Sequence, residues 1–111
     1  MACMGVNHGW ECYYVAVRGA AAHNGSLQER LQQCVLVLLP IRRDDFPNDE
    51  TFDRHKKLIS ETTKRAERHP DGGTLIATTS QMSDEEATRL LWEICDLFSI
   101  VTDAGRIHGR G

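Results

Sequence analysis

Residues 83–103, SDEEATRLLWEICDLFSIVTD, have the most regular hydrophobic pattern of the chain. Ser83 and Glu86 have the spacing of a capping box at the start of the segment, and Gly105 follows its last apolar position. At about 100° per residue the apolar side chains form one wide stripe, which consists of Ala87, Leu90, Leu91, Ile94, Leu97, Phe98 and Val101. The pattern predicts a long amphipathic helix that ends at Gly105.

The polar face of this predicted helix carries large apolar residues. Trp92 lies nearly opposite the apolar stripe, and Ile100 lies close to Trp92 on the helix surface. An exposed apolar patch of this kind usually marks a contact with another protein. We therefore predict an interface with Trp92 and Ile100 as apolar anchors, and Arg89 and Asp96 form its polar rim. The alternative is that Trp92 packs against the N-terminal segment or the tail of its own chain.

Length and composition indicate a single domain. A chain of 111 residues can build one hydrophobic core, and its 41% hydrophobic and 26% charged residues are near the averages for globular proteins.

A net charge of −3 gives no overall attraction to nucleic acid or to an anionic membrane. No apolar run reaches the roughly 20 residues that span a bilayer, and the N-terminus lacks a signal-peptide pattern. We expect a cytoplasmic protein with a domain over residues 10–104 and flexible segments at 1–9 and 105–111.

The cysteines predict reduced thiols. Cys3, Cys12, Cys34 and Cys95 are separated by 9, 22 and 61 positions, which matches neither zinc-ligand pairs nor a disulfide framework. The last three lie within apolar segments and are expected to pack as small hydrophobic residues, whereas Cys3 is expected to be mobile and exposed.

Three segments have the composition of buried strands. Residues 10–18 are rich in aromatic and β-branched side chains on both alternating faces. Residues 34–41 are all apolar, and Pro40 favours a strand that stops there. Residues 74–79 follow a glycine pair and form the third predicted strand. In a short run such as 34–41 periodicity does not separate strand from helix, so continuation of a helix from Ser26 is the alternative there.

Two further segments predict helices, and together with the strands they define the expected fold. Ser26 and Glu29 have capping-box spacing and start a short helix. Residues 49–68 begin with acids and end with bases, as the helix macrodipole favours. We therefore predict a small two-layer α/β sandwich of about three strands, covered on one face by two longer helices. The bare apolar face of such a sheet would be buried against a second copy, and we expect a homo-oligomer, dimer or higher.

A basic stripe on the helix at 49–68 is the one candidate for binding nucleic acid. It consists of Arg54, Lys57, Lys64 and Arg68. Acids four residues before a base explain most of these charges as helix support, in the pairs Glu50 with Arg54, Asp53 with Lys57 and Glu61 with Arg65. We therefore expect no nucleic-acid partner.

The chain contains no recognisable catalytic motif or cofactor motif. Asp44 and Asp45 follow the second predicted strand and could bind a divalent cation if the fold brings His23 or His55 close. A solvated charged loop explains the same acids. The alternative function is therefore a small metal-assisted hydrolase or nuclease.

The leading interpretation is a non-enzymatic, self-associating interaction module that needs no cofactor and no metal. A third hypothesis is a pocket for a small apolar or cationic ligand at the subunit junction, with Tyr14 or Trp92 in its wall.

Overall fold

The computed structural model describes residues 6–64 and 73–109, and the side chains of residues 8–64 and 73–104. These residues form five α-helices, one short 3-10 helix and no strand. The elements are α1 (Val6–Ala22), α2 (Leu27–Leu38), η1 (Arg43–Asp45), α3 (Asp49–Thr62), α4 (Gly73–Thr79) and α5 (Asp84–Gly109). The predicted two-layer α/β sandwich is therefore wrong, and the fold is an all-helical bundle.

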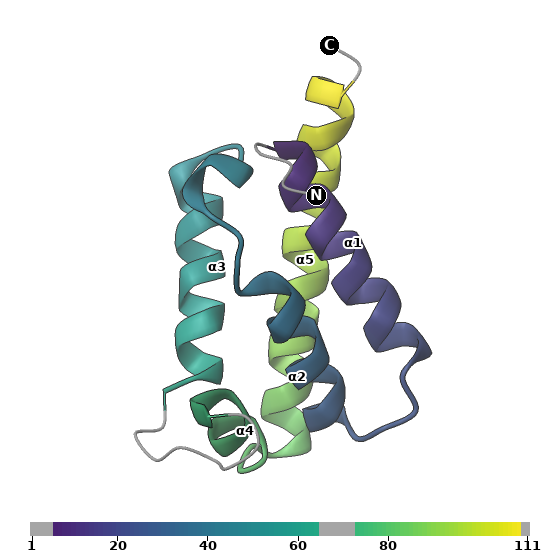
Figure 1. The fold of residues 1–111 in the computed structure, drawn as a ribbon, viewed down its shortest axis with the longest axis vertical. Coiled ribbons are helices and arrows are strands. Elements are labelled where there is room, and N and C mark those ends of the chain that lie inside the picture. Colours follow the sequence, from purple (N-terminus) through teal and green to yellow (C-terminus); the bar gives the residue numbers. More distant parts are fainter. Residues whose placement is uncertain (1–5, 65–72, 110–111) are drawn as a thin grey trace.

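The longest helix, α5, is the centre of the bundle. It packs against α1, α2 and α3, while the short α4 lies across the ends of α2 and α3 (Figure 1). The predicted amphipathic helix is confirmed, because its apolar stripe faces the core. Helix α5 does not end at Gly105, however, but continues to Gly109. The largest fully buried apolar side chains come from α1, α2, α3 and α5 and include Tyr13, Leu31, Leu38, Leu58, Leu90, Ile94, Leu97 and Val101.

Helices α1 and α5 extend beyond residues 10–104, the expected limits of the domain. Residues 6–9 form the first turn of α1, and residues 105–109 form the last turn of α5. The remaining parts of the two segments expected to be flexible, residues 1–5 and 110–111, lie outside the described residues, and so does Cys3. In the part of the chain that is described, no helix combines the length and hydropathy needed to cross a membrane.

Residues 10–18 are part of α1, so the predicted first strand is wrong. Gly9, Tyr13 and Ala16 are buried at helical spacing. One flank of α1 contacts α5 and the other contacts α2. A helix that is covered on two flanks keeps apolar residues around most of its circumference, and in sequence this resembles a strand that is apolar on both faces.

Residues 34–41 are not a strand either, and the alternative interpretation is correct. Ser26 caps α2: its side chain accepts a hydrogen bond from Glu29 N (3.1 Å), and Ser26 N donates to Glu29 Oε1 (3.0 Å). The helix then runs to Leu38, two residues before Pro40. Its buried residues have helical spacing and are Leu31, Cys34, Val35 and Leu38.

The third predicted strand, residues 74–79, lies in α4. Threonine and isoleucine are typical of strands. Here the hydroxyl groups of Thr79 and Ser80 donate hydrogen bonds to backbone carbonyls four residues earlier. Thr79 Oγ1 donates to Leu75 O at 2.8 Å, and Ser80 Oγ donates to Ile76 O at 2.6 Å. These bonds give the two hydroxyl groups partners within the same turn of chain.

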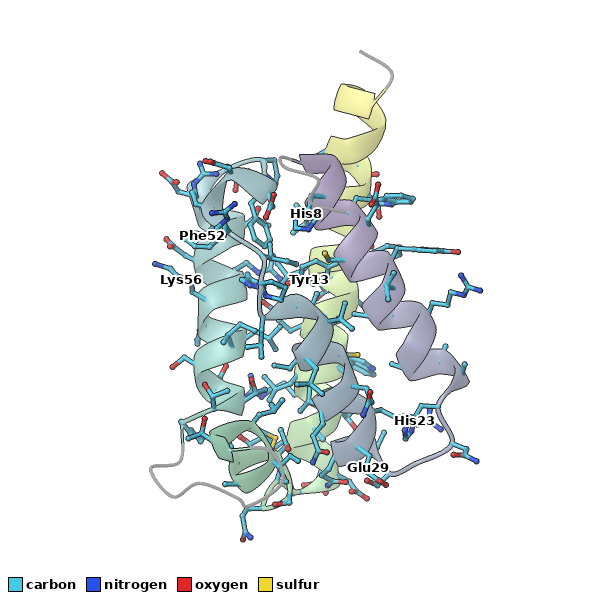
Figure 2. All side chains as sticks on the ribbon, viewed as in Figure 1. His8, Tyr13, His23, Glu29, Phe52 and Lys56 are labelled. Atoms are coloured by element: carbon cyan, nitrogen blue, oxygen red, sulfur yellow. The ribbon has the colours of Figure 1, made fainter. Side chains whose placement is uncertain are left out.

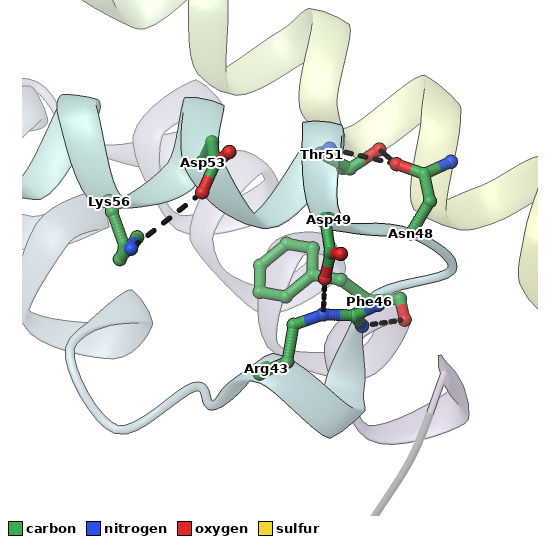
Figure 3. Close-up of polar contacts among 7 residues, drawn as sticks. All are labelled: Arg43, Phe46, Asn48, Asp49, Thr51, Asp53 and Lys56. Atoms are coloured by element: carbon green, nitrogen blue, oxygen red, sulfur yellow. Dashed lines mark hydrogen bonds and ion pairs between the residues drawn. The ribbon is translucent and has the colours of Figure 1, made fainter.

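Helix α3 begins where the sequence predicts and ends earlier. Asn48 is its N-cap, with Oδ1 accepting from Thr51 N at 2.8 Å, and Arg43 binds Asp49 and the carbonyl of Phe46 (Figure 3). The helix ends at Thr62. Residues 65–68 of the predicted helix lie outside the described residues.

Candidate functional site

The predicted interface on α5 is only partly exposed. Trp92 is 71% exposed, so its indole is not buried against the described part of its own chain. Ile100 is half-buried and packs against the core. Asp96 is exposed, whereas Arg89 binds Glu61 of α3, with Nη2 at 2.9 Å from Oε1. Trp92 therefore has the accessibility of an interface anchor, and Arg89 already has an intramolecular partner.

Charged groups between α3 and α5 account for two residues of the predicted basic stripe, Arg54 and Lys64, whereas Arg68 lies outside the described residues. Arg54 donates two hydrogen bonds to Glu93, at 3.0 and 2.8 Å. These bonds raise the pKa of Arg54 above its ordinary value. Lys64 lies 3.9 Å from Glu86. Arg54 thus forms its hydrogen bonds with Glu93 of α5 and not with Glu50 of its own helix. The charged pairs therefore link α3 and the residues just after it to α5.

The outer face of α1 is a second exposed surface, and the strand predicted at residues 10–18 gives no sign of it. Tyr14 and Val15 are 42% and 52% exposed, although they are large apolar residues. Glu11 and Arg18 are exposed on either side of them, three or four residues away. Among the side chains that the structure describes, neither charge has an ion-pair partner. We call these four residues the α1 face.

Aromatic rings connect the α1 face to α5. Trp10 and Tyr14 stack with their ring centroids 5.5 Å apart, and Tyr14 approaches Phe98 of α5 at 6.4 Å. Further along the same helix pair, an apolar pocket of about 220 Å³ opens beside Ala21, Leu91 and Cys95. This volume is below the roughly 300–1,000 Å³ of typical small-molecule sites. Tyr14, the predicted ligand-binding residue, does not line this pocket.

Polar side chains gather where α1, η1 and α3 meet, and we call His8, Tyr13, Asp45 and His55 the junction cluster. Asp45 is buried, and its Oδ2 lies 3.1 Å from His8 Nδ1 and accepts a hydrogen bond from Arg42 N at 2.9 Å. Tyr13 Oη lies 2.8 Å from His55 Nδ1. Figure 2 shows His8 and Tyr13 on α1, toward the same end of the bundle as Phe52 of α3.

The proposed metal site is brought together only in part. Asp45 is close enough to His55 for its charge to act on that imidazole, but Asp44 is exposed on the surface. His23 lies beyond the far end of α1 (Figure 2), where its Nδ1 accepts a hydrogen bond from Gly25 N at 2.9 Å. Within residues 8–64 and 73–104, no three acidic, histidine or cysteine side chains converge as ligands for a metal ion.

Burial keeps both partners of the Tyr13–His55 contact neutral. It lowers the pKa of His55 to about 4, and the charge of Asp45 opposes this shift only in part. Burial, aided by the charge of Glu93, raises the pKa of Tyr13 far above its ordinary value. A tyrosine that keeps its proton can donate it to the unprotonated Nδ1, so the contact is a neutral hydrogen bond within the core.

The described thiols have different environments. Cys34 is buried, and burial raises the pKa of its thiol to about 12. Cys95 is exposed on α5. Cys12 is half-buried, and its Sγ lies 3.5 Å from Nε2 of His8. The three cysteines are free, as expected, but Cys12 has a polar neighbour as well as apolar ones.

The sequence contains a signal for the Cys12–His8 contact. The two residues are four apart, which makes them neighbours on a helix, whereas the same spacing along a strand separates them by about 13 Å. A strand at residues 10–18, as the composition predicts, would not bring the pair together.

No family model matches this chain, and comparison with curated proteins and with solved structures gives no match either.

Proposed function

We propose that this protein is a non-enzymatic helical module that associates with a second copy of itself through α1 and the adjoining surface of α5. The observation that carries the proposal is the α1 face, where exposed Tyr14 and Val15 lie between Glu11 and Arg18. The free thiols of Cys12, Cys34 and Cys95 fit a reducing compartment, so we place the module in the cytoplasm.

The order of residues on the α1 face is self-complementary. If two α1 helices cross antiparallel about a twofold axis near Tyr14 and Val15, Glu11 of one copy lies opposite Arg18 of the partner subunit. The reverse pair forms by the same symmetry operation, as in any isologous interface. Apolar side chains then meet at the axis, and opposite charges flank them on both sides.

The area needed for a stable dimer brings α5 into the interface. Helix α1 is about 25 Å long and presents a strip about 10 Å wide, or about 250 Å². A standard interface buries roughly 800 Å² on each partner. The contact must therefore extend beyond α1, and the aromatic contact of Tyr14 with Phe98 continues the apolar surface onto α5. In this arrangement Trp92 and Asp96 belong to the outer part of the interface.

Single charge insertions test this arrangement. We expect Val15→Glu to raise the dimer dissociation constant at least about 100-fold, because it places two unpaired carboxylates beside the twofold axis. Trp92→Glu removes an outer anchor and should raise the constant about tenfold. The matched control is Leu36→Glu on α2, since Leu36 is also exposed, at 54%, but lies outside the proposed interface.

Sedimentation equilibrium measures all three variants. Dissociation by Val15→Glu, with Leu36→Glu unchanged from the wild type, supports the proposal. If Leu36→Glu dissociates the protein and Val15→Glu does not, the interface lies on another face.

A further inference from the structure

Cys12, His8 and Asp45 form a chain of contacts that the self-association does not use. Sγ of Cys12 lies 3.5 Å from Nε2 of His8, and the other ring nitrogen of His8 lies 3.1 Å from Oδ2 of Asp45. The imidazole therefore lies between a thiol and a carboxylate. A nucleophile beside a base that a third group orients is the usual arrangement of an activated thiol.

Asp45 is placed to control which nitrogen of His8 carries the proton. The contact between Nδ1 and Oδ2 lacks hydrogen-bond geometry, and no other described group bonds to Nδ1. The nearby carboxylate charge still favours the proton on Nδ1, which leaves Nε2 unprotonated and facing Cys12. Asp45 itself is held rigidly, since it is 1% exposed and accepts a hydrogen bond from Arg42 N. Close packing of Gly9 against the backbone of Asp45 fixes η1 beside α1.

We propose that Cys12 is a site of oxidative modification by hydrogen peroxide, with His8 as its base and Asp45 as the residue that positions His8. Cys12 and His8 are both partly exposed, so a molecule as small as peroxide can reach the sulfur. On the helical wheel Cys12 lies nearly opposite Tyr14 but only about 60° from Val15, so the modification site borders the α1 face without belonging to it.

The reaction balances with peroxide as the only other reactant. The thiol proton moves from Sγ to Nε2 of His8, and the thiolate attacks one peroxide oxygen. An S–O bond forms and the O–O bond breaks. The leaving hydroxide takes the proton back from His8 and departs as water. Sulfur is oxidised by two electrons to sulfenic acid, and peroxide is reduced.

Acyl transfer does not suit this site. Cys12 lies within α1, where backbone N–H groups are already bonded to carbonyls one turn earlier. A hydrolase of this type needs N–H donors that point at a developing oxyanion. A thiol on the side of a helix, beside a base, suits attack on a small electrophile that needs no such donors.

The other two described thiols are internal references within the same molecule. Cys34 is buried with a raised pKa and becomes reactive only if the protein opens. Cys95 is exposed, and no histidine contact accompanies it in the described residues. Modification of each cysteine can be followed separately by peptide mass spectrometry.

The first experiment uses the wild-type chain with hydrogen peroxide, and dimedone as a trap for sulfenic acid. We expect Cys12 to carry at least ten times more dimedone than Cys95, and Cys34 to carry none. Greater labelling of Cys95 than of Cys12 would overturn the proposal. The wild-type result stands even if the variants below do not fold.

The second experiment compares the wild type with His8→Gln by alkylation with iodoacetamide across the pH range. At pH 7 the rate at Cys12 should fall at least tenfold, and its pH profile should move upward by one unit or more. The rate at Cys95 should change less than twofold. Asp45→Asn should give a smaller change in the same direction.

An unchanged or faster rate at Cys12 in His8→Gln means that His8 only packs beside the thiol, and it contradicts the proposal. Reaction at Cys34 reports unfolding of a variant. In that case His8→Asn, which is smaller and neutral, replaces His8→Gln under the same criteria.

Discussion

The protein is expected to lose about 3 kcal/mol of stability between pH 6.5 and pH 4 through His55 alone. Burial lowers the pKa of His55 in the folded chain to about 4, against 6.5 when it is unperturbed. Between these values the unfolded chain binds a proton that the folded chain does not, so the free energy of unfolding falls as the pH falls. Above pH 6.5 and below pH 4 the two states are equally protonated at this site, and the contribution is constant. Each pKa unit corresponds to about 1.4 kcal/mol.

Urea denaturation at several pH values measures this dependence, and His55→Gln isolates it. Glutamine can accept the hydrogen bond from Tyr13 but does not titrate. We expect the variant to lose about 3 kcal/mol less than the wild type over this range, because all other carboxylates and histidines are present in both. Parallel pH profiles for the two proteins would mean that His55 titrates normally in the folded state.

Gly9→Ala is expected to destabilise the fold by about 1–3 kcal/mol, the usual cost of overpacking. A Cβ at this position would overlap the backbone carbonyl oxygen of Asp45 and lie 3.3 Å from its carbonyl carbon. These are backbone atoms, so they cannot move aside as the end of a side chain can. The substitution should push η1 away from α1 and separate His8 from Asp45.

Gly19→Ala is the matched control in the same helix. A Cβ at Gly19 meets no atom within 4 Å, so alanine should stabilise α1 by about 0.5–1 kcal/mol through helix propensity. Thermal unfolding of the two variants should therefore shift in opposite directions. If Gly9→Ala is also stabilising, η1 does not pack against α1 as described.

Helix boundaries were predictable where capping residues mark them. The starts of α2 and α5 were predicted correctly from Ser26 with Glu29 and from Ser83, because capping contacts are local in sequence. Residues 10–18 were assigned wrongly because α1 is covered on two flanks, and only the tertiary packing shows which helices cover it. The buried stripe of Tyr13 and Ala16 has helical spacing, but the exposed Tyr14 and Val15 between them conceal it in the sequence.

The candidate sites were predictable to a smaller extent. The exposure of Trp92 follows from helical periodicity, and the structure agrees with it. The interaction of Asp45 with His8 joins η1 to α1, two elements far apart in sequence. No local pattern indicates such a contact. Of the two histidines that the sequence offers to Asp45, His55 lies near it, whereas His23 lies beyond the other end of α1.

The central claim is a twofold dimer that pairs Glu11 with Arg18 of the partner subunit, and charge reversal tests it most directly. We expect the wild type to sediment as a dimer of 12.5-kDa chains. Glu11→Arg and Arg18→Glu should each raise its dissociation constant about tenfold, or about 1.4 kcal/mol, since like charges then face each other. The chain with both substitutions should return to within about threefold of the wild type, because both pairs are restored with their signs exchanged. A wild type that stays monomeric at all concentrations, or a double variant that associates no better than the single ones, would contradict the account.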